Sequence, residues 1–373
     1  MNITIKEVKT AGALKSFVNF QPQLYKGEKY YVQPLNKKEL NTLNKSKNPA
    51  MEFCDARYWL ALSHGKIVGR IAGIINHKFN ETSSATHIRF GWFDCIDDQA
   101  VASLLLEVVE NWGKEQKMQF IHGPLGFISF DRSGVLVDGF EEMPTSFGSY
   151  NYAYYNRLIM DAGYEKDVDW VEHLIIVPEK VPEKISKMAT AIMKRFDLKQ
   201  VELRNHKDVL LYANQLFAML NSAYEEIYGF VPLTDEITDN IIKDFIDIVK
   251  TDFISILTNK DEEVVGFGIA TPSLVKAFQK AKGRLFPFGF IHMMKALKKN
   301  DVADMLLIGV RPDYQNKGLH ALVFNKITQA FINHHYKYVE MTRVLEHNNK
   351  LLQLFSMYDI RQHKRARCYI KEL

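Results

Sequence analysis

Cysteine is scarce in this sequence of 373 residues, and no apolar run is long enough to span a bilayer. The three cysteines, Cys54, Cys95 and Cys368, are odd in number and far apart, so neither a disulfide framework nor metal-ligand spacing is visible. The N-terminal residues alternate like a strand and contain no apolar signal-peptide core. We therefore expect a cytoplasmic protein without a bound metal.

A strong excess of charge is also missing. Lysine and arginine number 48 against 44 acidic residues, which gives a formal net charge of +4. Such a mild charge does not by itself indicate a nucleic-acid partner, and we expect none. The hydrophobic content of 47% is typical of a folded globular protein. The length exceeds one ordinary hydrophobic core and predicts two domains, whereas the oligomeric state stays open.

One order of strands and helices occurs twice along the chain. In each half, a strand–turn–strand pattern precedes a strand, an amphipathic helix and another strand, and an apolar helix with a last strand follows. This repetition predicts a duplicated mixed α/β sheet. The expected positions are 58–75, 86–95, 100–115, 118–122, 154–162 and 170–176 in the first half, and 253–270, 305–310, 319–334, 338–344, 349–358 and 367–370 in the second.

The most informative segment is 304–322. An apolar strand ends before Pro312, a polar turn contains Gly318, and a helical pattern begins at once. Free backbone N–H groups and the positive end of the helix dipole meet at such a turn, and together they form an anion site. The pattern predicts a phosphate-bearing ligand, although connections of this kind also occur without one. A nucleotide P-loop is disfavoured because Gly-Lys-Ser/Thr is missing.

The turn reads Gln315-Asn316-Lys317-Gly318-Leu319-His320, and a second segment reads Asn349-Lys350-Leu351-Leu352-Gln353-Leu354-Phe355. The first string resembles the phosphate motif of the GNAT acyltransferase superfamily, and the second resembles the asparagine-led helix that follows it there. The segments 123–127, 134–140, 150–155 and 228–233 add a resemblance to bacterial two-domain GNAT proteins. The resemblance implies two tandem domains, each a mixed, mostly antiparallel sheet flanked by helices: a degenerate domain at 1–178 and an acyl-coenzyme A-binding domain at 183–373.

The resemblance further implies acetyl-coenzyme A or another acyl-coenzyme A as cosubstrate. Backbone N–H groups of the turn would form a nest for the pyrophosphate, and Gly318 lets the main chain approach it. The strand 307–310 would bond the pantetheine arm through its backbone, and Asn349 would hold the end of that arm. The expected cosubstrate residues are Ile308, Val310, Gln315, Asn316, Lys317, Gly318, Leu319, His320 and Asn349.

Two positions depart from the family pattern. His320 stands where Gly or Ala is usual, and Phe355 stands where many members have a Tyr that protonates the leaving thiolate. Tyr358 lies one helical turn later in the expected helix and is the candidate substitute. By resemblance, the acceptor amine attacks the thioester directly, which requires a base. Our catalytic candidates are Tyr358, Glu346 and His347, and Asp304, Glu225 and Glu226 are further candidate bases.

The first half has no comparable phosphate turn. Its equivalent at 94–100 contains no glycine and three acids, which would repel a pyrophosphate, so we expect no coenzyme A there. A tyrosine-rich segment follows in this half, and two interpretations of it stay open: an acceptor pocket, or an aromatic domain interface. The candidate acceptor residues are Tyr150, Asn151, Tyr154 and Tyr155, together with Tyr228 of the second half.

The segment 274–300 alternates basic and apolar residues around the aromatic tip Phe286-Pro287-Phe288. This pattern predicts an amphipathic hairpin that lies on an anionic membrane, covers a long acyl chain, or packs on its own domain as a lid. The basic stretch 361–367 is expected to be a solvated edge or to meet the 3′-phosphate of the coenzyme.

The leading functional hypothesis is an acyl-coenzyme A-dependent N-acyltransferase acting on a small-molecule amine. N-acylation of a lipid amine is a variant, favoured by a distant resemblance to GNAT-type bacterial ceramide synthases. Two further hypotheses stay open: a non-catalytic acyl-coenzyme A-binding or scaffold protein, and an aminoacyl-tRNA-dependent transferase.

Overall fold

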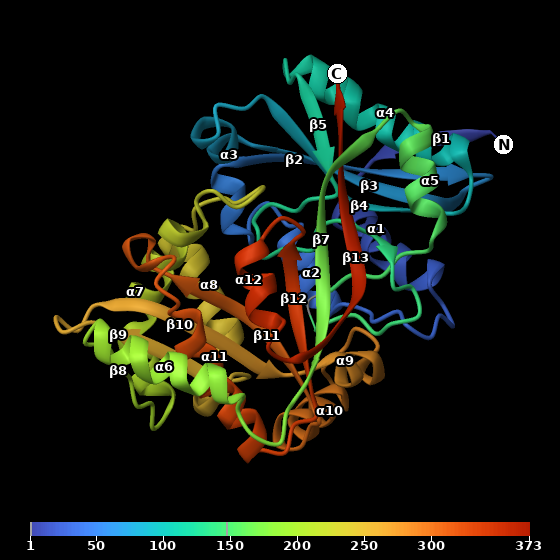
Figure 1. The fold of residues 1–373 in the computed structure, drawn as a ribbon. Helices are drawn as coiled ribbons and strands as arrows, with labels where there is room; N and C mark the ends of the chain where they lie inside the picture. Colours follow the sequence, from blue (N-terminus) through green and yellow to red (C-terminus); the bar gives the residue numbers. More distant parts are fainter. Residues whose placement is uncertain (1, 147) are drawn as a thin grey trace. The chain divides into compact units, whose positions relative to one another are not determined.

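The structure is a computed structural model that describes residues 2–146 and 148–373, without the side chains of Asn349, Lys350 and Leu354. The chain forms two compact units (Figure 1). The first unit contains the chain up to Val171 together with Val275–His292 and Lys364–Leu373, and the second contains Glu172–Leu274 and Met293–His363. The predicted domain ranges 1–178 and 183–373 are continuous, whereas these units are not. The assignment of functional domains to those ranges stays a prediction.

The first unit is a mixed sheet covered by helices. Its strand order is β1-β2-β3-β4-β5-β13, and the pairs are antiparallel except for the parallel pair β4–β5. Helix α4 packs its apolar face on β3, where a Cβ at Gly73 would lie 2.9 Å from the Trp112 ring. The strands are β1 (Ile3–Glu7), β2 (Cys54–Ser63), β3 (Lys66–Asn76), β4 (His87–Cys95), β5 (Phe120–Gly123) and β6 (Val135–Asp138), and the helices are α1 (Ala11–Leu24), α2 (Asn36–Thr42), η1 (Pro49–Glu52), α3 (His77–Thr82), α4 (Gln99–Glu115) and α5 (Tyr154–Asp161).

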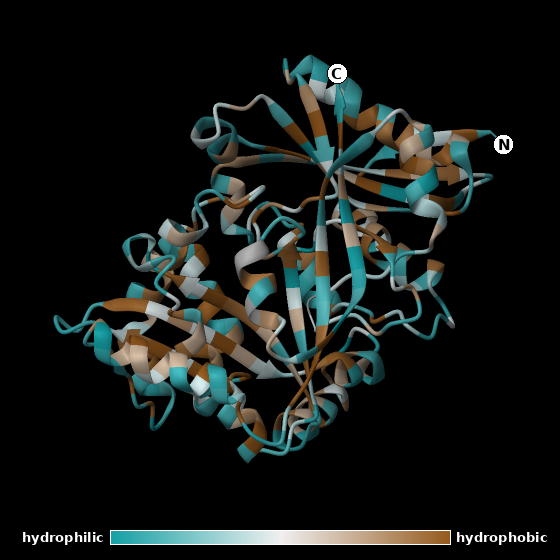
Figure 2. Cartoon of the chain, viewed as in Figure 1, coloured by the Kyte–Doolittle hydropathy of each residue, from teal (hydrophilic) through white to brown (hydrophobic). Residues whose placement is uncertain are grey.

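The second unit repeats this plan. Its strand order is β12-β11-β10-β9-β8, again antiparallel except for the parallel pair β11–β12, and hydrophobic residues predominate along β10 in Figure 2. Its strands are β8 (Lys199–Gln200), β9 (Ile254–Thr258), β10 (Val264–Pro272), β11 (Val302–Val310) and β12 (Tyr338–Leu345), and its helices are α6 (Glu183–Arg195), α7 (His206–Tyr224), α8 (Asp235–Phe245), η2 (Thr251–Phe253), η3 (Pro312–Tyr314), α11 (His320–Asn333) and α12 (Asn349–Phe355).

The predicted duplication of a mixed α/β sheet is therefore confirmed. The loop after β4 leads into α4 as the loop after β11 leads into α11, and in each unit the helix packs on the neighbouring strands. Strands β7 (Glu165–Ile176) and β13 (Asp359–Glu372) each run from one unit into the other.

Two local predictions are wrong. Helix α12 ends at Phe355, so Tyr358 does not continue its face one turn later. The basic stretch 361–367 is solvated only at Arg361 and Gln362, since the remainder is buried or half-buried in the long strand β13. There Lys364 is buried and donates to the Met143 carbonyl at 2.7 Å, and Arg367 pairs with the buried Asp169 at 2.8 Å.

The segment 274–300 forms the predicted helical hairpin. Helices α9 (Val275–Ala281) and α10 (Gly289–Lys298) flank a turn at which Phe286 and Phe288 are 76% and 69% exposed. Among the residues that the structure describes, no helix has the length and apolar character needed to cross a membrane.

Candidate functional site

The connection between β11 and α11 is a tight turn in the second unit. Asn316 and Gly318 both have left-handed backbone conformations, with φ angles of 62° and 80°. A Cβ at Gly318 would also lie 2.8 Å from Cδ1 of Ile192 on α6. Glycine at this position is therefore required both by the backbone conformation and by the close approach of α6.

Helix α11 begins without a cap. Its N-cap residue is Leu319, which has no side-chain acceptor to offer. Within the described chain, the N–H groups of Asn316, Gly318, Leu319 and His320 donate to no protein acceptor. Four donors without a protein acceptor thus lie within one turn beside the positive end of the helix dipole, an arrangement that suits a phosphate.

Charged side chains contribute unequally at this turn. The Lys317 ammonium lies 4.6 Å from the centre of the Tyr314 ring, which holds a positive charge beside the free N–H groups. Arg311 instead pairs with Asp313 at 2.7 Å and with Glu263 at 2.9 Å, so its charge is already balanced. Burial lowers the pKa of His320, and this ring is therefore neutral at physiological pH.

The two parallel strands next to the turn separate. Pairing joins 302–305 of β11 to 338–341 of β12 and, among the described residues, ends there although both strands continue. A register shift in β10 at Ile269/Ala270 leaves Leu306 as an extra residue of β11 at this point. The Thr342 hydroxyl donates to the Met305 carbonyl at 2.8 Å. The β11 edge beyond Leu306 is therefore released from β12, as the predicted backbone contact with a pantetheine arm requires.

Part of that released edge already has a partner. The Tyr224 hydroxyl, at the end of α7, donates to the Ile308 carbonyl at 3.0 Å. Burial raises the pKa of Tyr224 to about 12, so the phenol stays a neutral donor. The carbonyl of Ile308 is thereby occupied in this structure. Val310, the next residue on the same side of β11, pairs with Gly266 of β10.

A buried group of ionisable side chains lies where β11 and β12 separate. Asp304 and Glu340 are in register across the parallel pair, so their side chains share one face of the sheet. The side chain of Met305, the neighbour of Asp304 in β11, lies beside Gly268, where the side chain of Val323 of α11 also lies. Because consecutive residues of a strand point to opposite faces, Asp304 and Glu340 lie on the face away from α11. His363, on β13, has its Nε2 2.8 Å from Oε2 of Glu340.

Three further side chains belong to this group. Arg343 of β12 pairs with Glu172 at 3.2 Å. Burial and the neighbouring His363 lower the pKa of His173. Sequence reasoning found Asp304 but missed Glu340 and His363. The signal for Glu340 was an acid between the apolar residues Val339 and Met341 of an expected strand, whereas His363 is brought to it only by the fold.

The predicted catalytic residues are separated by the structure. Glu346, with a side chain 15% exposed, directly follows β12, and its Oε1 is 3.6 Å from Nε2 of the well-exposed His347. The Tyr358 hydroxyl instead lies 3.1 Å from the Thr328 hydroxyl of α11, and burial raises its pKa. Their catalytic roles stay predictions.

The remaining predicted residues of the second unit lie at its surface or outside the description. Glu225 and Glu226 are exposed beyond the end of α7, and Tyr228 is half-buried in the loop that follows. Helix α12 begins at Asn349 as expected, but the side chain of Asn349 lies outside the described residues.

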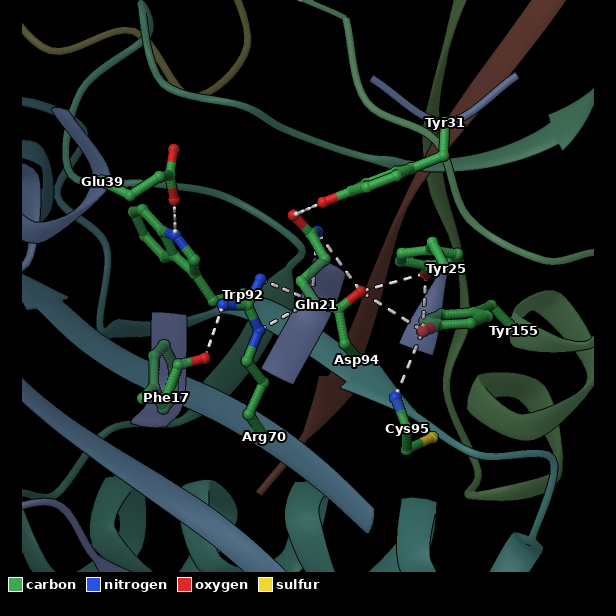
Figure 3. Close-up of polar contacts among 10 residues, drawn as sticks. All are labelled: Phe17, Gln21, Tyr25, Tyr31, Glu39, Arg70, Trp92, Asp94, Cys95 and Tyr155. Atoms are coloured by element: carbon green, nitrogen blue, oxygen red, sulfur yellow. Dashed lines mark hydrogen bonds and ion pairs between the residues drawn. The ribbon is translucent and has the colours of Figure 1, made fainter. Parts of the chain in front are cut away.

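The equivalent region of the first unit is closed by its own side chains (Figure 3). The Asp98 carboxylate caps α4 by accepting from the N–H groups of Ala100 and Val101 at 2.8 Å and 3.3 Å. At the end of β4, the Cys95 N–H donates to the Tyr155 hydroxyl at 3.2 Å, and the Tyr154 hydroxyl donates to the Cys95 carbonyl at 2.7 Å. Both backbone groups of Cys95 are therefore taken by side chains of the same unit.

Asp94 lies at the centre of this closed region. Its carboxylate pairs with the buried Arg70 at 2.6 Å and lies 3.0 Å from the Tyr25 hydroxyl, which in turn is 2.8 Å from that of Tyr155 (Figure 3). Gln21 adds an amide donor at 3.2 Å. The charge of Asp94 is thus satisfied from within the unit.

The predicted acceptor residues of the first unit are part of this interior. Asn151 is buried, and its amide both accepts from the Leu136 N–H at 2.7 Å and donates to the Leu136 carbonyl at 3.0 Å. Burial raises the pKa of Tyr150 to about 12, and its ring centre lies 5.7 Å from that of Tyr25. Contact of Tyr150, Asn151 and Tyr155 with an acceptor stays a prediction.

Solved structures of similar architecture identify the fold. A tandem GNAT protein from the clavulanic acid biosynthesis pathway superposes with a TM-score of 0.56 at 10% identity, covering 99% of this chain and 98% of that one. The chain has the tandem GNAT fold. A glucosamine N-acetyltransferase region of a fungal multi-domain β-N-acetylglucosaminidase gives a TM-score of 0.58 at 13% identity, covering 99% of this tandem GNAT chain and 38% of the other.

Curated relatives match the tandem GNAT chain over nearly its whole length. Protein YghO of Escherichia coli (strain K12) is 26% identical over 370 residues, which cover 96% of this chain and 93% of that protein. A bacterial ceramide synthase of Caulobacter vibrioides (strain NA1000 / CB15N) is 25% identical over 382 aligned positions, covering 100% and 98%. No protein-family model matches the chain.

Proposed function

We propose that the protein is an acyl-coenzyme A-dependent N-acyltransferase whose cosubstrate site lies in the second unit. The observation that carries this proposal is the uncapped N-terminus of α11 beside the separated strands β11 and β12. The free N–H groups from Asn316 to His320 suit the pyrophosphate of coenzyme A, and Lys317 adds a positive charge. The released edge of β11 then guides the pantetheine arm toward Leu306 and Thr342.

The chemistry proposed at this point is direct acyl transfer. The lone pair of a neutral amine attacks the thioester carbonyl, the C–N bond forms, and the C–S bond breaks to release the coenzyme A thiolate. The amine proton passes to a base, and the thiolate takes up a proton. Holding the two reactants together supplies much of the rate acceleration, so no covalent intermediate with the protein is required.

The pair Glu340 and His363 is our first candidate for that base. Nε2 of His363 lies 2.8 Å from Oε2 of Glu340, so an imidazole and a carboxylate, the two kinds of side chain that most often accept a proton in catalysis, lie together here. Both residues belong to the second unit and lie next to the separation of β11 and β12. Glu346 and His347, at the end of β12, are the second candidates.

A lipid amine is the acceptor that we propose, with a long-chain acyl-coenzyme A as donor. The likeness to a bacterial ceramide synthase at 25% identity supports this choice over a small soluble amine. The helical hairpin at 274–300 supports it too, because its tip exposes aromatic rings flanked by lysines and arginine, as peripheral membrane segments do. We accordingly propose a cytoplasmic protein in peripheral contact with the membrane.

Coenzyme binding is the direct test. Calorimetric titration with acetyl-coenzyme A and palmitoyl-coenzyme A should show binding of at least one, and Gly318→Glu should weaken it about a hundredfold or more because a carboxylate replaces and repels the phosphate. Gly65→Glu is the matched control, since Gly65 also has a left-handed φ of 75° but has open space around it. A melting curve of each variant separates lost binding from lost folding.

The outcomes of the titration are distinct. Absence of binding to either coenzyme would refute the proposal, as would equal binding by wild type and Gly318→Glu. Tighter binding of the palmitoyl thioester supports the lipid variant. Binding with no thiol release in the presence of long-chain amines would leave a non-catalytic acyl-coenzyme A-binding protein in its place.

A further inference from the structure

A cavity of about 440 Å³ lies in the first unit, and none of its lining residues belongs to the turn or strands that carry the proposed coenzyme site. Helices α1 and α2 and the segment after α9 form its walls. The polar part of its lining consists of four side-chain amides and two cations, without a carboxylate. The lining residues are Asn19, Pro22, Gln23, Gln33, Asn36, Ala281, Lys282 and Arg284.

The backbone turn that carries the two cations is held at the wall of this cavity. Lys282 and Gly283, just after α9, both adopt left-handed conformations with φ angles of 45° and 74°. The Gly283 carbonyl accepts from the Asn36 N–H at 3.0 Å, and a Cβ at Gly283 would lie 2.4 Å from Nε2 of Gln33. The turn is therefore seated closely against the start of α2. A further bond, from Gln279 Nε2 to the Lys29 carbonyl at 2.8 Å, holds α9 on the same unit.

Two of the four amides in the cavity are held in place by each other. Gln33 donates to Oδ1 of Asn36 at 2.9 Å, which fixes one amide against the other. Amide N–H groups beside lysine and arginine suit an anion that carries several oxygen atoms, and a phosphate ester fits this description best. The absence of a carboxylate from the lining removes the side chain that would repel such a group.

An apolar surface begins two residues after the second cation. Phe286 and Phe288 are the most exposed aromatic rings of this segment, and Phe290 and Ile291 continue the surface with 37% and 38% exposure. The first-unit segment thus places a phosphate-type cavity and a solvent-exposed aromatic tip within a few residues of each other. At the surface of a bilayer, phosphate headgroups likewise lie directly next to hydrocarbon, so the cavity corresponds to the headgroups and the tip to the hydrocarbon.

We infer that this cavity binds the phosphate-bearing headgroup of a membrane lipid while the Phe286–Phe288 tip enters the bilayer. The inference deepens the membrane contact proposed above and does not depend on acyl transfer. In this arrangement the tip supplies apolar burial, and Lys282, Arg284 and the four amides recognise the headgroup.

Vesicle flotation of the full-length protein tests the inference. Vesicles of phosphatidylcholine with phosphatidylglycerol are compared with vesicles made equally negative by oleate, which has no phosphate. Wild-type protein should bind the phosphatidylglycerol vesicles more tightly, and the double variant Lys282→Gln/Arg284→Gln should lose about tenfold in affinity relative to the control. The control is Lys276→Gln/Lys280→Gln, which removes the same charge from exposed positions of α9 outside the cavity lining.

Each outcome decides for or against the headgroup site. Equal loss in both double variants, or equal binding to oleate vesicles, would show general surface attraction and overturn the inference. Phe286→Ser/Phe288→Ser should release the protein from all vesicles. Binding of soluble glycerol phosphate with the same affinity as the vesicles would assign the cavity to a soluble ligand instead. Coenzyme A binding by all these variants should equal that of wild type, so failure here is separable from failure of the acyltransferase proposal.

Discussion

Both units contain the same strand–turn–helix connection, but the helix N-terminus is capped in the first unit and uncapped in the second. In the first unit, Asp98 caps α4 with a carboxylate. In the second, α11 begins at Leu319 with no cap, and the turn before it contains Gly318 in a left-handed conformation. A helix needs acceptors for its first N–H groups, and these come from the protein or from a ligand. The helix N-terminus is thus closed by a carboxylate in the first unit and left uncapped in the second, where we propose the phosphate site.

The strand ends beside these helices show the same contrast between a closed first unit and an open second unit. In the first unit, the segment after β5 turns back, and the Leu125 N–H donates to the Phe90 carbonyl at 2.8 Å. Cys95, which pairs with Gly69 as Val310 pairs with Gly266, has both backbone groups bound by tyrosines. In the second unit the chain after β12 proceeds to α12 instead. The first unit thus fills with its own side chains the region that corresponds to the proposed cosubstrate site of the second.

The largest effect on stability is expected at Asp94, the buried carboxylate at the centre of the closed region of the first unit. Asp94→Ala leaves Arg70 buried without its anion, so the free energy of unfolding should fall by about 3–5 kcal/mol. All four tryptophans lie in the first unit, so their fluorescence during urea denaturation reports on it alone. The control is Asp97→Ala, whose partner Arg157 is exposed and whose ion pair is worth at most about 1 kcal/mol. Equal small losses in both variants would contradict a structural role for Asp94.

Removal of the proposed base, which lies in the second unit, should lower the rate of acyl transfer. His363→Asn and Glu340→Gln should each lower kcat about a hundredfold for thiol release with a long-chain amine acceptor, while the KM for acyl-coenzyme A changes little. Glu346→Gln and His347→Asn serve as comparisons. If these two variants lose the activity instead, the base lies at the end of β12.

The comparison also shows what sequence alone can reveal. Periodic apolar patterns such as that of 100–115 depend on local geometry, so the duplicated sheet and the turn at Gly318 were predicted correctly. The environment of 361–367 was not predicted, because Asp169, the ion-pair partner of Arg365 and Arg367, lies about two hundred positions away in the chain. The pairing of His363 with Glu340 is equally non-local. The end of α12 at Phe355 escaped prediction because neither glycine nor proline marks it.

Acidification should destabilise the first unit through its buried histidines. Burial and the nearby Arg89 lower the pKa of His122 well below its usual value, and burial also lowers that of His87. The unfolded chain therefore binds more protons below about pH 6.5, and stability falls with pH by at most about 1.4 kcal/mol per pH unit for each histidine. Urea denaturation followed by tryptophan fluorescence at pH 7.5 and 5.5 measures this, and His122→Gln should reduce the dependence. An unchanged slope in the variant would exclude His122 as its source.

The smallest effect tests whether the cap alone distinguishes the two units. Asp98→Ala should lower the free energy of unfolding of the first unit by about 1 kcal/mol, the usual value of an N-cap, again measured by tryptophan fluorescence. It should not create a second coenzyme A site, because Tyr154 and Tyr155 still occupy the backbone of Cys95. Calorimetric titration should give the same stoichiometry for the variant as for wild type. A second equivalent of bound coenzyme A would mean that the capping carboxylate is the main barrier, and that the side chains filling the strand end adjust readily to a ligand.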